Sequence, residues 1–231
     1  MPKEKLNTSC TGHRKRLRER YLKTGFEGFS EHEVIEYLLF YVRPREDTKS
    51  IAKDLLCKFK NFHGILKADI KELKQVEGIK DISAEFFKSL QSVVEYYYKE
   101  KTKNNEIQFL NIDDLVKYLK ATIGNKKNEI LECFYLNSKN ELLKAETLGE
   151  GTVTEAVAFP RKIVEGALKN SAASVILAHN HPGGLNEPSE NDDQITKNVM
   201  EALKIVKINL QEHVILSDNG YYSYRKNGFF D

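Results

Sequence analysis

The sequence has 231 residues, of which 40% are hydrophobic and 30% charged, with a formal net charge of +2. These proportions are ordinary for a globular protein, and the length suffices for one large domain or two small ones. No apolar run approaches the roughly 20 residues of a membrane-spanning helix, and the first ten residues (MPKEKLNTSC) lack the apolar segment of a secretory signal. We therefore expect a cytoplasmic protein without membrane segments.

The positive charge is concentrated at the N-terminus. Residues 1–25 contain eight Lys or Arg and two Glu, a charge of +6, so the remaining residues together carry −4. The densest part is the cluster GHRKRLRERYLKTG. A basic segment of this kind is typical of nucleic-acid binding, which makes DNA a candidate partner. It is equally typical of the solvated face of a helix.

Residues 30–99 are predicted to be helical. SEHEVIEYLLFYV begins with Ser30 and has Glu33 three residues later, which is a capping-box pattern. DTKSIAKDLLCKF repeats the apolar spacing of about 3.6 residues. The next segment, ADIKELKQVEGIKDISAEFFKSLQSVVEYYYKE, predicts a short helix, a turn at Gly78 and a longer helix.

Three widely spaced cysteines argue against disulfides, and Cys57 and Cys133 lie among apolar residues that predict a core location.

The Gly78 turn resembles a helix-hairpin-helix element, in which a glycine turn lets backbone N–H groups approach a DNA phosphate. Gly78 occupies the first glycine position, but Lys80 stands where the second glycine is usually found. This departure favours simple helix pairing over phosphate binding. The polar segment KEKTKNNEIQ that follows (99–108) is interpreted as a linker or as the frayed end of the long helix. We place the domain boundary near Asn104, which gives domains 1–104 and 105–231.

Beyond residue 105 the pattern changes from helical to mixed. The predicted elements are a helix (NIDDLVKYLKATIG), two strands around a Ser-Lys-Asn turn with a glycine-rich loop (NEILECFYLNSKNELLKAETLGEGT), a helix (PRKIVEGALKNSA), an apolar strand (SVILAHNH), a helix (SENDDQITKNVMEALKIVKI) and two closing strands (EHVILSDNGYYSY). This alternation predicts a small mixed sheet flanked by helices. The expected fold class is α+β, or mixed α/β.

Two histidines at the end of the apolar strand form a candidate metal site. His179 and His181 are two residues apart, so in an extended strand their imidazoles point to the same face. Pro182–Gly184 permits a sharp turn, after which Asp192 can return to the same point from the first turn of the next helix. Two His and one Asp satisfy the ligand count of a catalytic zinc site, with a fourth position left open for water.

The same residues have a purely structural interpretation. Ser189 is a good helix N-cap and Asp192 suits the third position of that helix, so the pair could simply begin a helix. Capping and metal binding are nevertheless compatible. A further histidine, His213, could support a metal ligand or be a structural histidine.

The stretch HNHPGGLNEPSEND resembles the JAMM (MPN+) metalloprotease signature of HxH, seven residues, Ser, two residues and Asp. The wider stretch GTVTEAVAFPRKIVEGALKNSAASVILAHNHPGG is similar to the bacterial RadC family, as is the helical N-terminal part. The resemblance implies a cytidine-deaminase-like JAMM/MPN domain over residues 105–231. It also implies that His179, His181 and Asp192 bind zinc and that Ser189 assists the oxyanion.

In JAMM proteins an upstream glutamate acts as general base. Two candidates lie nearby, Glu129 and Glu132, and on a strand these two residues would face opposite sides. RadC-like proteins tend to have a glutamate just before this strand, which matches Glu129.

The resemblance thus implies a zinc metallohydrolase that cleaves a peptide or isopeptide bond, with Glu129 as base. The alternative is a DNA-associated protein of RadC type, acting in DNA repair or recombination through its basic helical domain. A non-catalytic metal-binding scaffold is disfavoured, because every implied ligand is present.

Overall fold

The computed structural model describes residues 8–44, 46–104, 106–151 and 159–230. The chain divides into two compact units, one extending to Ser92 and the other beginning at Val93. The division falls within a long helix, α6 (Asp81–Lys103), so the first half of the segment interpreted as a linker or frayed helix end is helical. Residues 1–7 of the basic region and 152–158 of the RadC-like stretch lie outside the described residues.

The first unit is helical, as predicted. Its helices are α1 (Thr8–Thr24), α2 (Glu31–Val42), α3 (Lys49–Phe59), α4 (Phe62–Lys67), α5 (Ile70–Leu73) and the beginning of α6. The capping box of α2 is confirmed, since the Ser30 amide donates to Glu33 Oε2 at 2.9 Å. Helix α4 lies within the stretch predicted to be helical, although no separate helix was assigned there; the Asn61 side chain caps it by accepting a bond from the Gly64 amide at 2.7 Å.

The Gly78 turn packs against α3. Gly78 has a φ of +86°, and a Cβ added there would lie 2.6 Å from Cδ1 of the buried Ile51. Glycine is therefore required here for two reasons, the left-handed backbone conformation and the close approach of α3. This contact agrees with the interpretation of the turn as a helix-pairing element.

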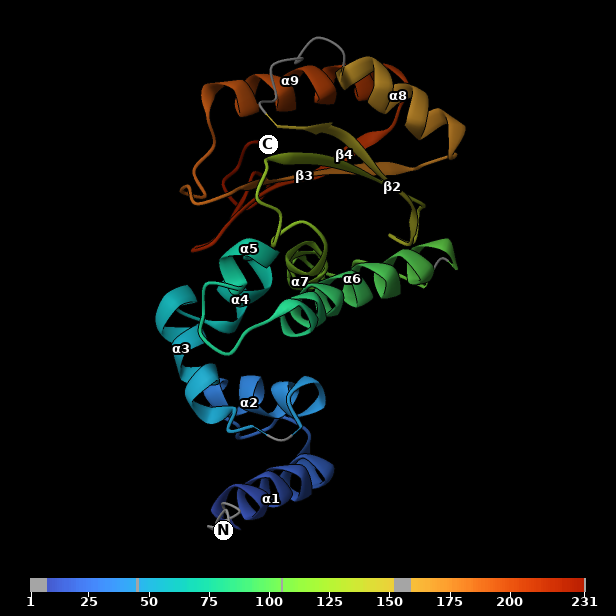
Figure 1. Cartoon of the computed structure of the whole chain (residues 1–231). Coiled ribbons are helices and arrows are strands. Elements are labelled where there is room, and N and C mark those ends of the chain that lie inside the picture. The colour runs from blue at the N-terminus through green and yellow to red at the C-terminus, as the bar shows by residue number, and fades with distance from the viewer. Residues whose placement is uncertain (1–7, 45, 105, 152–158, 231) are drawn as a thin grey trace, which may run out of the picture. The chain divides into compact units, whose positions relative to one another are not determined.

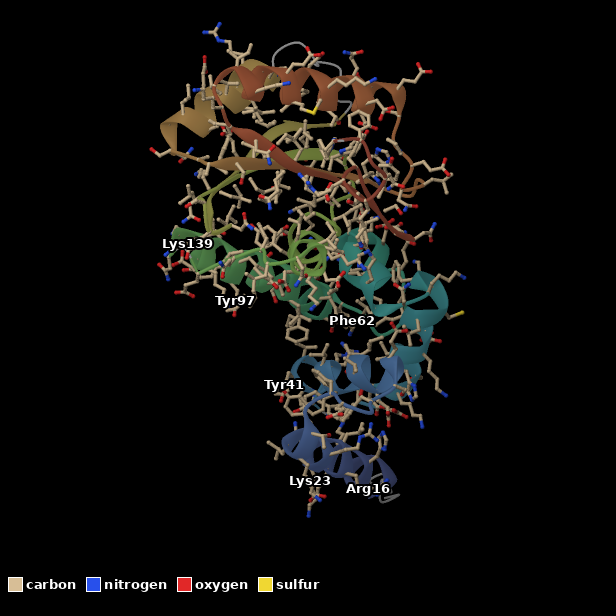
Figure 2. The ribbon with its side chains drawn as sticks, turned by 180° about the vertical axis from the view of Figure 1, so that it is seen from behind. Arg16, Lys23, Tyr41, Phe62, Tyr97 and Lys139 are labelled. Carbon is tan, nitrogen blue, oxygen red and sulfur yellow. The ribbon has the colours of Figure 1, made fainter. Side chains whose placement is uncertain are left out.

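The basic cluster lies in α1, where two of its arginines bind within the unit. The Arg14 guanidinium donates to the carbonyls of Arg43 at 2.8 Å and Pro44 at 2.6 Å. Arg20 forms a 2.7 Å ion pair with Glu33. Four other cations of α1 have exposed side chains: Lys15, Arg16, Arg18 and Lys23. Figure 2 shows the side chains of Arg16 and Lys23 extending from α1.

The second unit is built on a five-stranded mixed sheet in the order β2-β1-β3-β4-β5. The strands are β1 (Ile130–Leu136), β2 (Leu142–Glu150), β3 (Ser174–His181), β4 (Asn209–Ser217) and β5 (Gly220–Ser223). Only β3 and β4 are parallel; the other neighbouring strands are antiparallel. The predicted α+β class, with a helical region followed by a mixed sheet flanked by helices, is confirmed.

Helices cover both faces of this sheet (Figure 1). Helices α8 (Phe159–Lys169) and α9 (Glu190–Ile205) pack on one face, and α7 (Ile112–Thr122) packs on the other. The central strand β3 is buried on both sides up to Asn180, as its continuous apolar run predicts. Among the described residues, no helix is long and apolar enough to cross a membrane.

The two cysteines expected in the core differ in environment. Cys133 is buried on β1, as predicted, whereas the prediction for Cys57 is wrong because its side chain is exposed on α3. The buried face of α3 is formed by Ile51, Ala52 and Leu55. Cys57 follows Leu55 by two positions, a rotation of about 200°, which turns it to the opposite face.

Candidate metal centre

The two histidines converge at the end of the central strand. His179 is 2% exposed and lies opposite Leu131 of β1, on the face covered by α8 and α9. His181 is the last residue of β3 and points to the same face, as the period of two predicts. The Nε2 atoms of the two rings are 2.9 Å apart.

Asp192 reaches these rings from the first turn of α9. Its Oδ1 lies 3.3 Å from His179 Nε2, and its Oδ2 lies 3.6 Å from His181 Nε2. Ser189 is the N-cap of α9, and both its amide, at 2.8 Å, and its hydroxyl, at 2.6 Å, donate to Asp192 Oδ2. The helix cap and the cluster of candidate ligands therefore use the same two side chains.

Glu129 and Glu132 lie on opposite sides of the sheet. Glu129 immediately precedes β1, and its Oε1 is 3.5 Å from His181 Nε2. The potential ligand atoms of Glu129, His179 and His181 all lie within 4.8 Å of one another. Glu132 pairs with Ala178 and faces the other side of the sheet, where burial raises the pKa of its carboxyl group. The structure thus places Glu129, and not Glu132, beside the histidines.

The hydrogen bonds of the imidazoles determine which nitrogen atoms carry protons. His181 Nδ1 lies 3.0 Å from the carbonyl oxygen of Leu185, which only accepts, so Nδ1 must be the donor. His179 Nδ1 lies 3.0 Å from His213 Nε2. With its proton on Nδ1, a neutral His181 directs the lone pair of Nε2 toward the His179 ring and toward the carboxylate of Asp192. Such a group of acceptors repels itself unless a cation, either a proton or a metal ion, lies among them.

The geometry fits zinc. With zinc–ligand distances of about 2.0–2.2 Å, a tetrahedral site places its ligand atoms roughly 3.3 Å apart. The measured separations among His179, His181 and Asp192 run from 2.9 to 3.6 Å. Electrostatics favour a cation here, because the hydrogen bond with Asp192 raises the pKa of His181. Burial acts to raise the pKa of Asp192, but hydrogen bonds with His179 and His181 outweigh it and hold this pKa well below its usual range.

Asn180, between the two histidines, has a role that the sequence did not reveal. Its side chain is buried on the opposite face, where Oδ1 accepts from the Ile130 amide at 2.8 Å. Its amide nitrogen donates to the carbonyls of Asn128 at 3.0 Å and Lys126 at 3.3 Å. These bonds hold the segment that carries Glu129. A polar residue inside a buried strand was the available signal, since such a group needs partners.

Known protein families and individual relatives match most of this chain. Residues 109–229 match the family model of the RadC-like JAB domain, and residues 11–84 match that of the UPF0758 N-terminal region. A UPF0758 protein of Fusobacterium nucleatum subsp. nucleatum is 37% identical over 223 residues, covering 94% of this chain and 96% of that protein. A UPF0758 protein of Carboxydothermus hydrogenoformans is 36% identical over 215 residues, covering 93% and 95%.

Proposed function

Because this chain belongs to the RadC family of UPF0758 proteins, we propose that its second unit is a JAMM-type zinc hydrolase that cleaves a peptide or isopeptide bond. The observation that carries the proposal is the convergence of the Nε2 atoms of His179 and His181, 2.9 Å apart, beside the carboxylate of Asp192. This pair and the nearby carboxylates need a cation between them. The HxH, Ser and Asp spacing of the JAMM signature supports the same assignment.

His179, His181 and Asp192 would hold the metal ion. Asp192 suits a ligand, because its side chain is 10% exposed and approaches both rings. The Glu129 side chain is 32% exposed, with Oε1 3.5 Å from His181 Nε2, which suits a group that faces substrate and solvent. Zinc bound here would supply Lewis-acid activation of water and of the scissile carbonyl group.

The remaining steps belong to side chains of the protein. The Glu129 carboxylate would accept a proton from the attacking water and deliver it to the leaving amine, as a general base and then a general acid. The Ser189 hydroxyl, which donates to Asp192 Oδ2 in this structure, would turn its single proton from that carboxylate to the oxyanion. A single donor of this kind contributes about 3–4 kcal/mol to transition-state stabilisation.

The test begins with metal analysis of the natively purified protein. We expect about one zinc ion per chain, lost in His179→Ala. Glu129→Gln should keep the metal and lose hydrolysis, whereas the matched variant Glu132→Gln, on the other face of the sheet, should keep both. Hydrolysis is measured on a fluorogenic peptide library and on Lys-ε-linked isopeptides. Absence of bound zinc in the wild-type protein would overturn the proposal.

A second candidate function is DNA binding by the first unit, as part of DNA repair or recombination. The observation in its favour is the exposed set of cations on α1, Lys15, Arg16, Arg18 and Lys23. Binding of a labelled duplex should weaken steeply with salt, because cations released from the phosphates drive it. The variant Arg16→Glu/Arg18→Glu should abolish binding without unfolding α1, since neither residue carries the contacts made by Arg14 and Arg20. DNA binding that does not change with salt concentration, or that is the same in the variant and the wild type, would exclude this function.

A further inference from the structure

A buried chain of hydrogen bonds leads from His179 away from the candidate metal ligands. His179 Nδ1 lies 3.0 Å from Nε2 of His213, a residue of β4. The other nitrogen of His213, Nδ1, lies 2.7 Å from Oγ1 of Thr196 on α9. Both His213 and Thr196 are almost completely buried, so no solvent competes for these bonds.

The direction of each bond follows from Thr196. Its hydroxyl donates its only proton to the backbone carbonyl of Asp192 at 2.6 Å, so it must accept from His213. His213 Nδ1 is therefore protonated. Burial disfavours a charged ring, so a neutral His213 with its proton on Nδ1 leaves Nε2 unprotonated and able to accept. The donor to that atom can only be His179 Nδ1.

We propose that His213 and Thr196 are positioning residues that hold His179 in the tautomer protonated at Nδ1, with Nε2 free for the metal ion. The inference rests on the proposed function, since it assigns the groups that prepare one of the ligands. Hydrogen bonds to the outer nitrogen of a ligating histidine fix its tautomer and ring orientation, and their loss costs about 10- to 100-fold in metal affinity.

The chain of bonds also links two ligands from different elements. It starts at His179 on β3 and ends at the carbonyl of Asp192 on α9, so strand and helix are held together behind the metal site. Tyr224 stacks on the His213 ring with a centroid distance of 4.7 Å and an interplanar angle of 5°. Its hydroxyl donates to Asp193 at 2.8 Å. These contacts restrict rotation of the His213 ring.

His181 provides an internal contrast. Its Nδ1 donates to the backbone carbonyl of Leu185, which no substitution removes. His179 depends instead on two side chains, and these can be changed. The tautomer of His179 is therefore the property that substitutions at His213 and Thr196 should alter.

The first test compares Thr196→Val with Thr196→Ser. Valine has nearly the shape of threonine but cannot accept from His213, so the proton of His213 can move to Nε2 and force His179 into the wrong tautomer. We expect zinc affinity, measured by competition with a chromophoric chelator, to fall about 10- to 100-fold in Thr196→Val and to stay near wild type in Thr196→Ser. Thr122→Val is the matched control, because Thr122 makes the same kind of helical hydroxyl bond, to Tyr118, within α7. Equal affinities in all four proteins would overturn the inference.

The second test changes His213 and reads the tautomer directly. His213→Gln keeps an acceptor within reach of His179 and should bind zinc more tightly than His213→Leu, which keeps volume but has no acceptor. The ¹⁵N signals of His179 in metal-free wild-type protein at about pH 8, above the ordinary histidine pKa of about 6.5, should show a proton on Nδ1. A proton on Nε2 contradicts the inference even if the variants fail to fold. Failure of the wild type to bind zinc would instead contradict the proposed function, leaving this tautomer measurement as a separate result.

Discussion

The two units of this protein differ in how they bury polar side chains. Three polar or charged residues of the first unit are buried among those described: Glu36, Thr48 and Ser83. In the described part of the second unit eight are buried: Ser174, His179, Asn180, Asp192, Thr196, Glu212, His213 and Ser223. Among the described residues of the first unit, one oxygen of Glu36 and the hydroxyl of Thr48 have no hydrogen-bond partner, while buried polar groups around the candidate metal centre are joined to one another.

This difference agrees with the proposed location of the functional site in the second unit. Burying a polar group is unfavourable unless it is hydrogen-bonded, and a connected network is expensive to disrupt. A buried polar network is therefore expected where the function of the protein depends on the positions of the polar groups. The second unit therefore carries the precise arrangement, and the first unit offers mainly an exposed cationic helix.

Removal of the proposed zinc ion should have the largest difference in effect between the two units. A ligand that binds only the folded state stabilises it by roughly 3–4 kcal/mol at 100 to 1,000 times its dissociation constant. We expect a chelator to lower the protection of β3, β4 and α9 in hydrogen exchange and to leave α2 and α3 unchanged. An equal loss of protection in both units would show that they do not respond independently.

Two glycine substitutions should each destabilise one unit. A Cβ at Gly166 would lie 2.0 Å from the hydroxyl oxygen of the buried Tyr135, so Gly166→Ala should cost up to about 3 kcal/mol in the second unit. Gly78→Ala combines a φ of +86° with the contact to Ile51 and should cost a similar amount in the first unit. Denaturant unfolding followed by hydrogen exchange assigns each loss to its unit. A loss that spreads across both units would contradict the division at Ser92.

Asn180→Leu should affect stability and catalysis together. The variant removes the side-chain partners of three backbone groups, and each unsatisfied group costs about 1–3 kcal/mol. Because the released segment carries Glu129, we expect kcat to fall more than zinc affinity. Asn128→Ala is the control, since among the described residues the Asn128 side chain bonds to Glu150 at 3.2 Å in an exposed position. Unchanged kcat in Asn180→Leu would show that the segment needs no such support.

The smallest expected effect on stability comes from the ion pair between Arg20 and Glu33 in the first unit. The hydrogen bond from Arg20 lowers the pKa of Glu33 from 4.5 to about 2 in the folded protein. The stabilisation is therefore complete above about pH 4.5 and is lost as the pH falls toward 2. A partly exposed pair contributes at most about 1 kcal/mol, so Arg20→Gln should reduce stability by less than that at neutral pH. The difference from wild type should vanish near pH 2, whereas a constant difference would assign the effect to the Arg20 contact with the Phe29 ring.

The sequence by itself determined the parts of the site that depend on neighbouring residues. Strand alternation places His179 and His181 on one face, and the cap of the next helix places Ser189 beside Asp192. These relations are local, because they follow from the period of a strand and the geometry of a helix start. The helical first region and the mixed sheet follow from the same periodicities.

Only the tertiary structure decided which distant groups join this cluster. Antiparallel pairing of β1 with β3 brings Glu129 to His181 and turns Glu132 to the other face, and the Asn180 side chain holds that arrangement. Parallel pairing of β3 with β4 places His213 behind His179. Strand order and register arise from packing across the whole unit, so no local pattern encodes them.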